Sequence, residues 1–376
     1  MSYNMKIGLL GFGTVGSHVY RLLEGRSDLQ VASVLSRRAR PELACTVTPD
    51  FDAIVHNDEI GAIVEVMGGL HPAYEYVCAA MRSGKHVVTA NKQLMCAYYD
   101  ELLPLAKECG VSLRCTAAAG GGIPWLTSLA RAGRLDRVTA VEGILNGTTN
   151  YMLSEMTGNG ADYADALRQA QRLGYAEADP TADVEGLDAR RKLVLSANLA
   201  FGVSVQEADI PCVGISAITA ADIEKAKDLG LTFKLIARAE RCGDAVAAYV
   251  CPTLFPASFP EAHMDGTGNL ATLYAERIGK QSFSGAGAGG WPTASNVVAD
   301  CLAVAEGCAS YYTDRAEPCS IDNSAAPGRW LFRRGGDYVF GDYSAEQAFE
   351  VYDIYLEEDP TALMARVIPS EEESED

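Results

Sequence analysis

The sequence predicts an α/β protein with a doubly wound parallel sheet, followed by a second domain of α+β type. Three observations support this fold class. Short apolar strands alternate with helices through the first part of the chain, a glycine-rich turn follows the first strand, and longer helices with a new strand-rich tract begin after about residue 140. Strands that are buried on both faces of a parallel sheet read as continuous apolar runs, as they do here.

Composition narrows the class of protein. The 376 residues include 31 Lys and Arg against 50 Asp and Glu, a net charge of −19, which argues against nucleic acid and anionic membranes as partners. Eleven cysteines are scattered without a C-x-x-C pair, which indicates reduced thiols and a cytoplasmic location. We read no signal peptide at the start and no apolar run long enough to span a membrane.

The first domain is predicted to cover residues 1–142. Its expected strands are 5–10, 29–36, 53–55, 62–66 and 86–89, and its expected helices follow residue 16 and cover 72–83 and 102–109. A later apolar helix, 293–307, follows the glycine-rich segment GAGAGGWPTAS and is predicted to complete this domain.

The second domain is predicted to cover 143–292. It contains long helical stretches at 161–173 and 186–201 and strands at 235–240, 245–255 and 281–287. Residues 308–376 are expected to form an extension with a short strand pair (RWLF and YVF) and a disordered acidic end, EEESED.

A dinucleotide-binding turn is predicted directly after the first strand. The residues Gly11-Phe12-Gly13-Thr14-Val15-Gly16 match G-x-G-x-x-G between a strand and a helix, as in a Rossmann-type domain. The first glycine permits the tight turn, the second lets the backbone approach a pyrophosphate, and the third lets helix and strand pack closely. The alternative is a glycine turn in an α/β domain that binds no nucleotide.

The end of the second strand indicates the type of dinucleotide. It reads Val34-Leu35-Ser36-Arg37-Arg38, without the acid that usually binds the ribose hydroxyls of NAD. Two guanidinium groups suit a 2′-phosphate, so NADP is favoured and NAD stays open. The alternative is that Arg37 and Arg38 are surface charges.

A cluster of acids precedes a lysine in GYAEADPTADVEGLDARRK, residues 174–192. Asp188 and Lys192 are four residues apart, so they share one face of a helix that is otherwise apolar. A lysine beside a carboxylate in a cleft can act as a general acid, whereas an exposed pair would have no function. A second lysine, Lys92, follows the strand at 86–89, at the edge of the sheet where ligands bind in such folds.

Taken together, several motifs resemble the homoserine dehydrogenase family. They occur in family order over most of residues 5–307: GLLGFGTVG, EVMGGLHPAYEYVCAAMRSGKHVVTANK, AGGGIP, GILNGTTNYML, GYAEADPTADVEGLDARRK and GAGAGGWPTAS. The resemblance implies reversible NADP-linked interconversion of aspartate 4-semialdehyde and homoserine, a step toward threonine, isoleucine and methionine. It also implies that the second domain serves catalysis and dimerisation in a homodimer.

The resemblance assigns roles to individual residues. It implies that Lys192 is the catalytic acid and base, that Glu177 and Asp188 bind the substrate, that Asp183 is a nearby acid, and that Lys92 lies near the nicotinamide. The resemblance also assigns Gly174 and Gly289 to the cofactor site, in addition to the glycine turn, Arg37 and Arg38.

Family members often bind a monovalent cation such as sodium through main-chain carbonyls of the GGIP loop. By position these ligands are Thr116, Ala119, Gly121 and Ile123. The sequence departs from the family here, since Thr116 replaces the usual Glu and Ala118 the usual Ser.

The C-terminal extension is too short for a complete ACT regulatory domain, so we expect no inhibition by threonine. Two alternatives stay open at this point. One is a semialdehyde dehydrogenase that uses a cysteine nucleophile such as Cys96 or Cys115, and the other is an NADP-binding sensor without catalysis.

Overall fold

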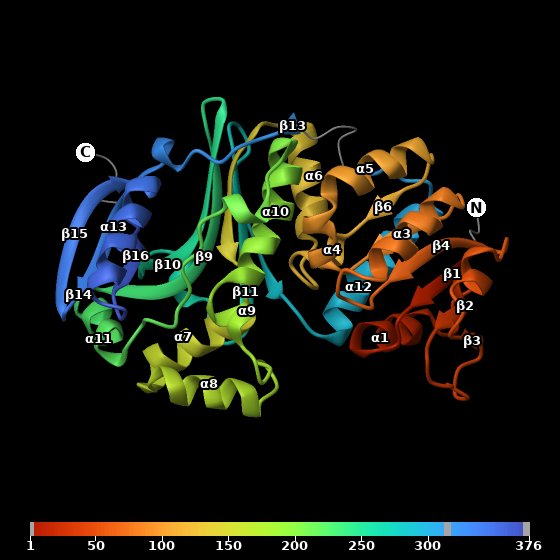
Figure 1. Ribbon diagram of the computed structural model, residues 1–376, viewed down its shortest axis with the longest axis horizontal. Coiled ribbons are helices and arrows are strands. Elements are labelled where there is room, and N and C mark those ends of the chain that lie inside the picture. The colour runs from red at the N-terminus through yellow and green to blue at the C-terminus, as the bar shows by residue number, and fades with distance from the viewer. Residues whose placement is uncertain (1–3, 312–316, 371–376) are drawn as a thin grey trace. The chain divides into compact units, whose positions relative to one another are not determined.

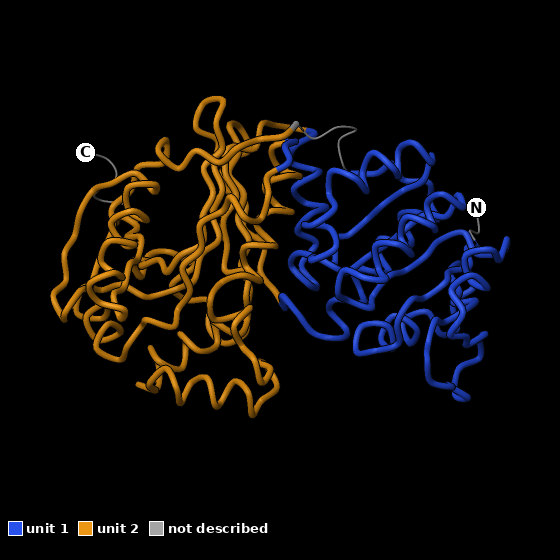
Figure 2. Tube along the Cα trace, in the orientation of Figure 1, with its two compact units in different colours: residues 1–134, 202–204, 286–317 blue, residues 135–201, 205–285, 318–376 orange. Residues whose placement is uncertain are grey.

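The computed structural model describes residues 4–311 and 317–370 and divides into two compact units. Unit 1 consists of residues 1–134, 202–204 and 286–317, and unit 2 of residues 135–201, 205–285 and 318–376 (Figure 2). Within the described ranges, no helix is both long and apolar enough to cross a membrane.

Unit 1 is built on a six-stranded parallel sheet. Its spatial order is β3-β2-β1-β4-β5-β6, with each neighbouring pair parallel. The strands are β1 (Met5–Leu10), β2 (Leu29–Leu35), β3 (Thr46–Thr48), β4 (Ile60–Glu65), β5 (His86–Thr89) and β6 (Leu113–Arg114). The chain leaves β1 toward β2 on one side and returns to β4 on the other, so the predicted doubly wound topology is confirmed.

Helices cover both faces of this sheet. On one face, α1 (Thr14–Leu23) and α12 (Gly290–Ala305) lie side by side over an apolar core that includes Ile7, Val64 and Cys301 (Figure 1). On the other face lie α3 (Ala73–Arg82) and α5 (Tyr99–Glu108). The shorter elements of the unit are α2 (Asp52–Val55), α4 (Lys92–Ala97), the 3-10 turn η1 (Thr116–Ala118), α6 (Trp125–Leu135) and β8 (Val203–Ser204).

One predicted strand of unit 1 was wrong. Residues 53–55 form the helical turn α2, which begins where the Asp50 carboxylate accepts a hydrogen bond of 3.0 Å from the Asp52 N–H. The turn buries both Ile54 and Val55, and Ile54 packs against the backbone of Gly8. A strand would have sent these neighbours to opposite faces, and a three-residue apolar run does not by itself separate the two structures.

Unit 2 contains an eight-stranded mixed sheet in the order β12-β11-β7-β9-β10-β16-β14-β15. The strands are β7 (Val138–Ile144), β9 (Leu231–Cys242), β10 (Ala245–Pro256), β11 (Gly268–Ala275), β12 (Gly279–Ala286), β14 (Pro327–Arg334), β15 (Asp337–Ser344) and β16 (Leu363–Val367). The β9–β10 hairpin is antiparallel, whereas β10 and β16 are parallel. The α+β character predicted for the second part of the chain is therefore confirmed.

Helix α10 (Leu187–Phe201) packs on β7 and β9, and α7 (Gly147–Asn159) packs on β9 and β11. The residues of the candidate site lie on these helices or next to them. The remaining elements are α8 (Tyr163–Arg172), α9 (Thr181–Val184), η2 (Glu207–Asp209), α11 (Ala220–Asp228), η3 (Pro260–His263), β13 (Glu317–Pro318), η4 (Asn323–Ala325) and α13 (Ala345–Glu358).

The C-terminal residues contribute to the sheet of unit 2. The expected strand pair is present as the antiparallel hairpin β14–β15. The structure adds α13, which begins with a capping box between Ser344 and Gln347, and β16, which lies between β10 and β14. Trp330 and Met364 share an apolar cluster with α13. The acidic end 371–376, predicted to be disordered, lies outside the described residues.

Candidate active site

The glycine turn after β1 has the backbone that a dinucleotide cradle requires. Gly11 has a φ of +102°, which favours glycine, and a Cβ on Gly16 would lie 2.2 Å from the Gly11 carbonyl oxygen. A Cβ on Gly13 would meet nothing within 4 Å, so packing within the chain does not explain this glycine. Its bare backbone leaves room for a ligand at the N-terminus of α1, whose first turn carries no acidic residue.

Basic side chains follow the end of β2. The Ser36 hydroxyl donates to the Arg38 carbonyl oxygen over 2.8 Å and forms a tight turn in which Arg37 and Arg38 are exposed. A third guanidinium, that of Arg40, lies 5.2 Å from the ring centroid of Phe12 in the glycine turn. Sequence reasoning missed Arg40, although its place two residues past Arg38 was a usable signal.

A buried carboxylate shapes the neighbouring edge of the sheet, where the strand order reverses. Glu65, at the end of β4, accepts hydrogen bonds from the Met67 N–H at 2.8 Å, the Gly68 N–H at 3.3 Å and the Thr89 hydroxyl at 2.5 Å. Burial raises the pKa of Glu65. Glu65 was not among the residues expected to be functional, and its signal in the sequence is an acid at the end of the apolar strand AIVE.

Lys92 is placed by the same network. The Asn91 N–H donates to the Thr89 hydroxyl over 3.0 Å, and the Asn91 side chain caps α4 by accepting from the Leu94 N–H. The Asn91 amide also donates to the Gly69 carbonyl oxygen over 2.7 Å. Lys92 is the first residue of α4 and half-buried, at the carboxyl edge of the sheet as expected.

In unit 2, one asparagine joins two of the predicted acids. The Asn146 side-chain oxygen accepts from the Thr149 N–H and caps α7, which directs its amide nitrogen toward the carboxylates. That nitrogen donates to Asp183 over 2.7 Å and to Asp188 over 2.9 Å. Asn146 is the first residue of the NGTTN motif, whose role the residues alone had not indicated.

Lys192 completes this cluster. Its ammonium forms an ion pair of 2.8 Å with Asp188 and donates to the Leu145 carbonyl oxygen over 2.6 Å. Lys192 and Asp188 are 7% and 8% exposed, so the exposed ion pair considered from the sequence is excluded. Two carboxylates against one ammonium leave a net charge of −1, which suits a ligand that carries its own ammonium.

Asp183 is the more accessible acid of the cluster. Burial raises the pKa of its carboxyl group and so does the neighbouring Asp188, whereas the hydrogen bond from Asn146 lowers it. A cationic ligand beside Asp183 would favour its charged form.

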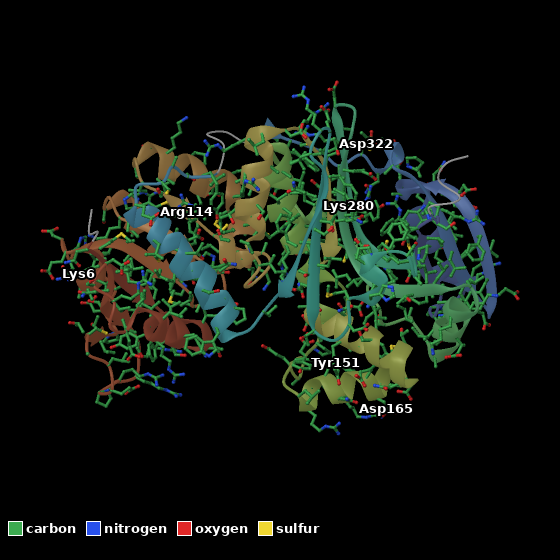
Figure 3. All side chains as sticks on the ribbon, turned by 180° about the vertical axis from the view of Figure 1, so that it is seen from behind. Lys6, Arg114, Tyr151, Asp165, Lys280 and Asp322 are labelled. Atoms are coloured by element: carbon green, nitrogen blue, oxygen red, sulfur yellow. The ribbon has the colours of Figure 1, made fainter. Side chains whose placement is uncertain are left out.

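The loop before α9 is attached to α7. The Thr148 hydroxyl donates to the Tyr175 carbonyl oxygen over 2.7 Å, and Tyr151, labelled in Figure 3, contacts the Tyr175 ring edge-on at 5.0 Å between centroids. Gly174 ends the α8 turn with a φ of +78°. Glu177 lies exposed in this loop, and the described hydrogen bonds of the Asn146 cluster do not include it.

The residues predicted to bind a cation lie in η1 and in the loop between η1 and α6. Thr116, Ala119 and Ile123 are buried, but the carbonyl oxygens of Gly121 and Ile123 both accept hydrogen bonds from the Asn296 side chain, at 2.6 and 2.9 Å. Gly289, predicted to bind the cofactor, precedes α12 with a φ of +109°. The described residues contain no group of three or more His, Cys, Asp or Glu suited to a metal.

The parallel sheet with its glycine turn and the buried lysine–carboxylate cluster define a nicotinamide-dependent oxidoreductase. Family models agree with this class: the model for the homoserine dehydrogenase NAD binding domain matches residues 11–116, and the homoserine dehydrogenase model matches residues 124–302.

The chain belongs to the homoserine dehydrogenase family. It is 40% identical over 314 residues to the homoserine dehydrogenase of Bacillus subtilis, covering 80% of this chain and 72% of that one. It is 43% identical over 320 residues to that of Corynebacterium glutamicum, covering 80% and 71%. The structure of a homoserine dehydrogenase from Thiobacillus denitrificans matches with a TM-score of 0.89 and 30% identity, over 97% of this chain and 98% of the other.

The enzyme therefore has homoserine dehydrogenase activity with an NAD(P) cofactor and acts in amino-acid biosynthesis. The sensor and the cysteine-dependent dehydrogenase are not favoured. Cys96 and Cys115, the candidate nucleophiles, are both buried.

Proposed function

We propose that Lys192 is the proton donor and acceptor in the reversible, NADP-linked reduction of L-aspartate 4-semialdehyde to L-homoserine. The observation that carries this assignment is the buried cluster of Lys192, Asp188, Asn146 and Asp183. The cofactor supplies a hydride to the aldehyde carbon. Reduction then requires one proton at the aldehyde oxygen, and a buried ammonium is suited to donate it.

Each neighbour of Lys192 has a separate task in this mechanism. Asp188 pairs with the ammonium and, with the Leu145 carbonyl oxygen, fixes two of its three N–H groups. The third N–H is the one that we assign to the substrate oxygen. In the oxidation of homoserine, the same nitrogen acts as the neutral amine and accepts the hydroxyl proton, which regenerates the ammonium.

The carboxylates bind the substrate ammonium. We assign this role to Asp183 and Asp188, because Asn146 holds both and the cluster retains a net negative charge. Glu177 is proposed as a further acid for the same ammonium, and its exposed position in the loop leaves it free to change conformation.

For the cofactor, we propose NADP held by residues 11–16 with Arg37 and Arg38 at its 2′-phosphate. The absence of an acid at the end of β2 and the turn at Ser36 support this preference. Lys92 and Gly289 are proposed to line the same cofactor, and the assignment of Gly174 to the cofactor stays a prediction from the family resemblance. The predicted sodium does not fit the loop as folded, since Asn296 already occupies the Gly121 and Ile123 carbonyl groups, and no step of the mechanism uses it.

We also infer a cytoplasmic homodimer formed through unit 2, which the family and the long sheet of unit 2 support.

The test is oxidation of L-homoserine followed by the absorbance of the reduced nicotinamide, with NADP and NAD in parallel. We expect a higher kcat/KM with NADP. A preference for NAD would contradict the proposed role of Arg37 and Arg38, and no turnover with either would contradict the assigned reaction.

A further inference from the structure

A side-chain amide of this chain occupies the position predicted for the cation. We propose that Asn296 replaces a monovalent cation as the bridge between two carbonyl groups of the loop 119–123, and that it makes the enzyme independent of sodium and potassium. Asn296 is thereby a positioning residue for the segment next to the proposed cofactor site.

The geometry of the bridge is specific. Asn296 Nδ2 lies 2.6 Å from the Gly121 carbonyl oxygen and 2.9 Å from the Ile123 carbonyl oxygen, and the Asn296 side chain is buried. An amide nitrogen has two hydrogens, one for each acceptor. If the amide were flipped, its own oxygen would face the two carbonyl oxygens and be repelled by them. The two acceptors therefore determine that the amide nitrogen faces the loop.

A cation cannot bridge the same two oxygens from the same side. The lone pairs that face each other across the loop are occupied by hydrogens that carry partial positive charge, and these hydrogens would repel an ion placed between them. The amide also satisfies two buried carbonyl groups without the dehydration that an ion would need.

A second side chain of α12 holds η1, the turn that leads into the loop 119–123. Asp300, one turn after Asn296, accepts hydrogen bonds of 2.8 Å from both the N–H and the hydroxyl of Thr116. Arg114, labelled in Figure 3, lies 3.9 Å from the Asp300 carboxylate. Thr116 stands where the family usually has Glu, and a neutral hydroxyl can face Asp300 without repulsion between carboxylates.

The position of this loop is critical because it touches the glycine-rich segment before α12. A Cβ on Gly121 would lie 2.4 Å from the carbonyl carbon of Gly287, and one on Gly122 would lie 2.7 Å from Pro292 Cβ. The Gly122 N–H also donates to the Ala286 carbonyl oxygen over 2.9 Å. A displaced loop would therefore displace the backbone around Gly289, which we place in the cofactor site.

The test compares the wild type with Asn296→Ala and Asn296→Asp in sodium, potassium and tetramethylammonium chloride at equal ionic strength. For each protein, the melting temperature and the kcat/KM for homoserine oxidation are measured. We expect the wild type to vary less than twofold in kcat/KM among the three salts, with an unchanged melting temperature.

The two variants are expected to acquire a dependence on the cation. In Asn296→Asp a carboxylate faces two carbonyl oxygens, which is unfavourable until an ion lies between them, so sodium or potassium should raise the melting temperature and restore activity. In Asn296→Ala the space is open and a weaker effect of the same sign is expected. Ser295→Asp adds the same charge at an exposed neighbouring residue and should behave like the wild type.

Two results would overturn the proposal. One is a wild type whose melting temperature or kcat/KM rises with sodium or potassium over tetramethylammonium, because the cation would then bind beside Asn296. The other is an Asn296→Asp variant that is as stable and active as the wild type in all three salts. The salt dependence of the wild type tests the proposal even if neither variant folds.

Discussion

Replacement of Lys192 by Met tests the centre of the proposed mechanism. Methionine retains much of the length and packing of the lysine and removes the ammonium that pairs with Asp188. Loss of a general acid lowers turnover by about 100-fold to 10,000-fold. The lower limit corresponds to about 2.7 kcal/mol of transition-state stabilisation.

The same change has a predictable effect on stability. It leaves the Asp188 carboxylate buried with the Asn146 amide as its donor and leaves the Leu145 carbonyl oxygen without the ammonium. Removal of one partner of a buried ion pair typically costs about 3–5 kcal/mol. Because loss of a neighbouring ammonium raises the pKa of a buried carboxyl group, the variant should lose stability relative to the wild type as the pH rises from 5 to 8.

The effect on turnover is measured by stopped-flow and steady-state kinetics of homoserine oxidation at saturating cofactor. The effect on stability is measured by urea unfolding at each pH. Arg191→Met is the matched control, since Arg191 is a basic residue of the same helix that pairs with Glu207 instead. We expect its kcat to stay within about threefold of the wild type. A folded Lys192→Met enzyme with kcat within fivefold of the wild type would refute the proton-transfer role.

Three further predictions address the cofactor and the loop. Gly16→Ala places a Cβ 2.2 Å from the Gly11 carbonyl oxygen, so we expect at least tenfold weaker NADPH binding by fluorescence, and unchanged affinity would contradict the cradle geometry. Arg38→Ala should raise the KM for NADP about tenfold and leave that for NAD nearly constant, whereas an equal effect on both would place Arg38 elsewhere. Burial raises the pKa of Asp300 to about 6 from 3.8. The raised pKa stabilises the folded state below pH 3.8, and this contribution is lost as the pH rises through 6. Urea unfolding should therefore show the wild type losing about 2 kcal/mol relative to Asp300→Asn between pH 4 and 7. Parallel curves for the two proteins would contradict this titration.

Local sequence patterns were sufficient to predict most of the helices and strands of unit 1. The turn at residues 11–16, the strand before it and the helix after it depend on backbone freedom and apolar spacing within about twenty residues, and the structure agrees with them. The same kind of reasoning failed at 53–55, where three apolar residues were compatible with a strand or a helical turn. Packing of Ile54 against Gly8, far away in sequence, decided between them.

The candidate site was predictable as a set of residues but not as an arrangement. The spacing of Asp188 and Lys192 indicated a pair on one helix face, and the family resemblance supplied its chemistry. The link to Asp183 depends on Asn146, which comes from the start of a different helix. Glu65 was overlooked for a similar reason, because one of its partners, Thr89, lies at the end of the next strand, after α3.

The sequence by itself therefore determined the class of fold, the dinucleotide turn and the family to which the chain belongs, since these depend on periodicity and short motifs. Only the tertiary structure decided how the loop 119–123 is held. Asn296 and its acceptor Gly121 are 175 residues apart, and their contact exists only because α12 returns to the sheet beside α1. A hydrogen bond between such distant residues is set by the packing of whole elements, which no local pattern encodes.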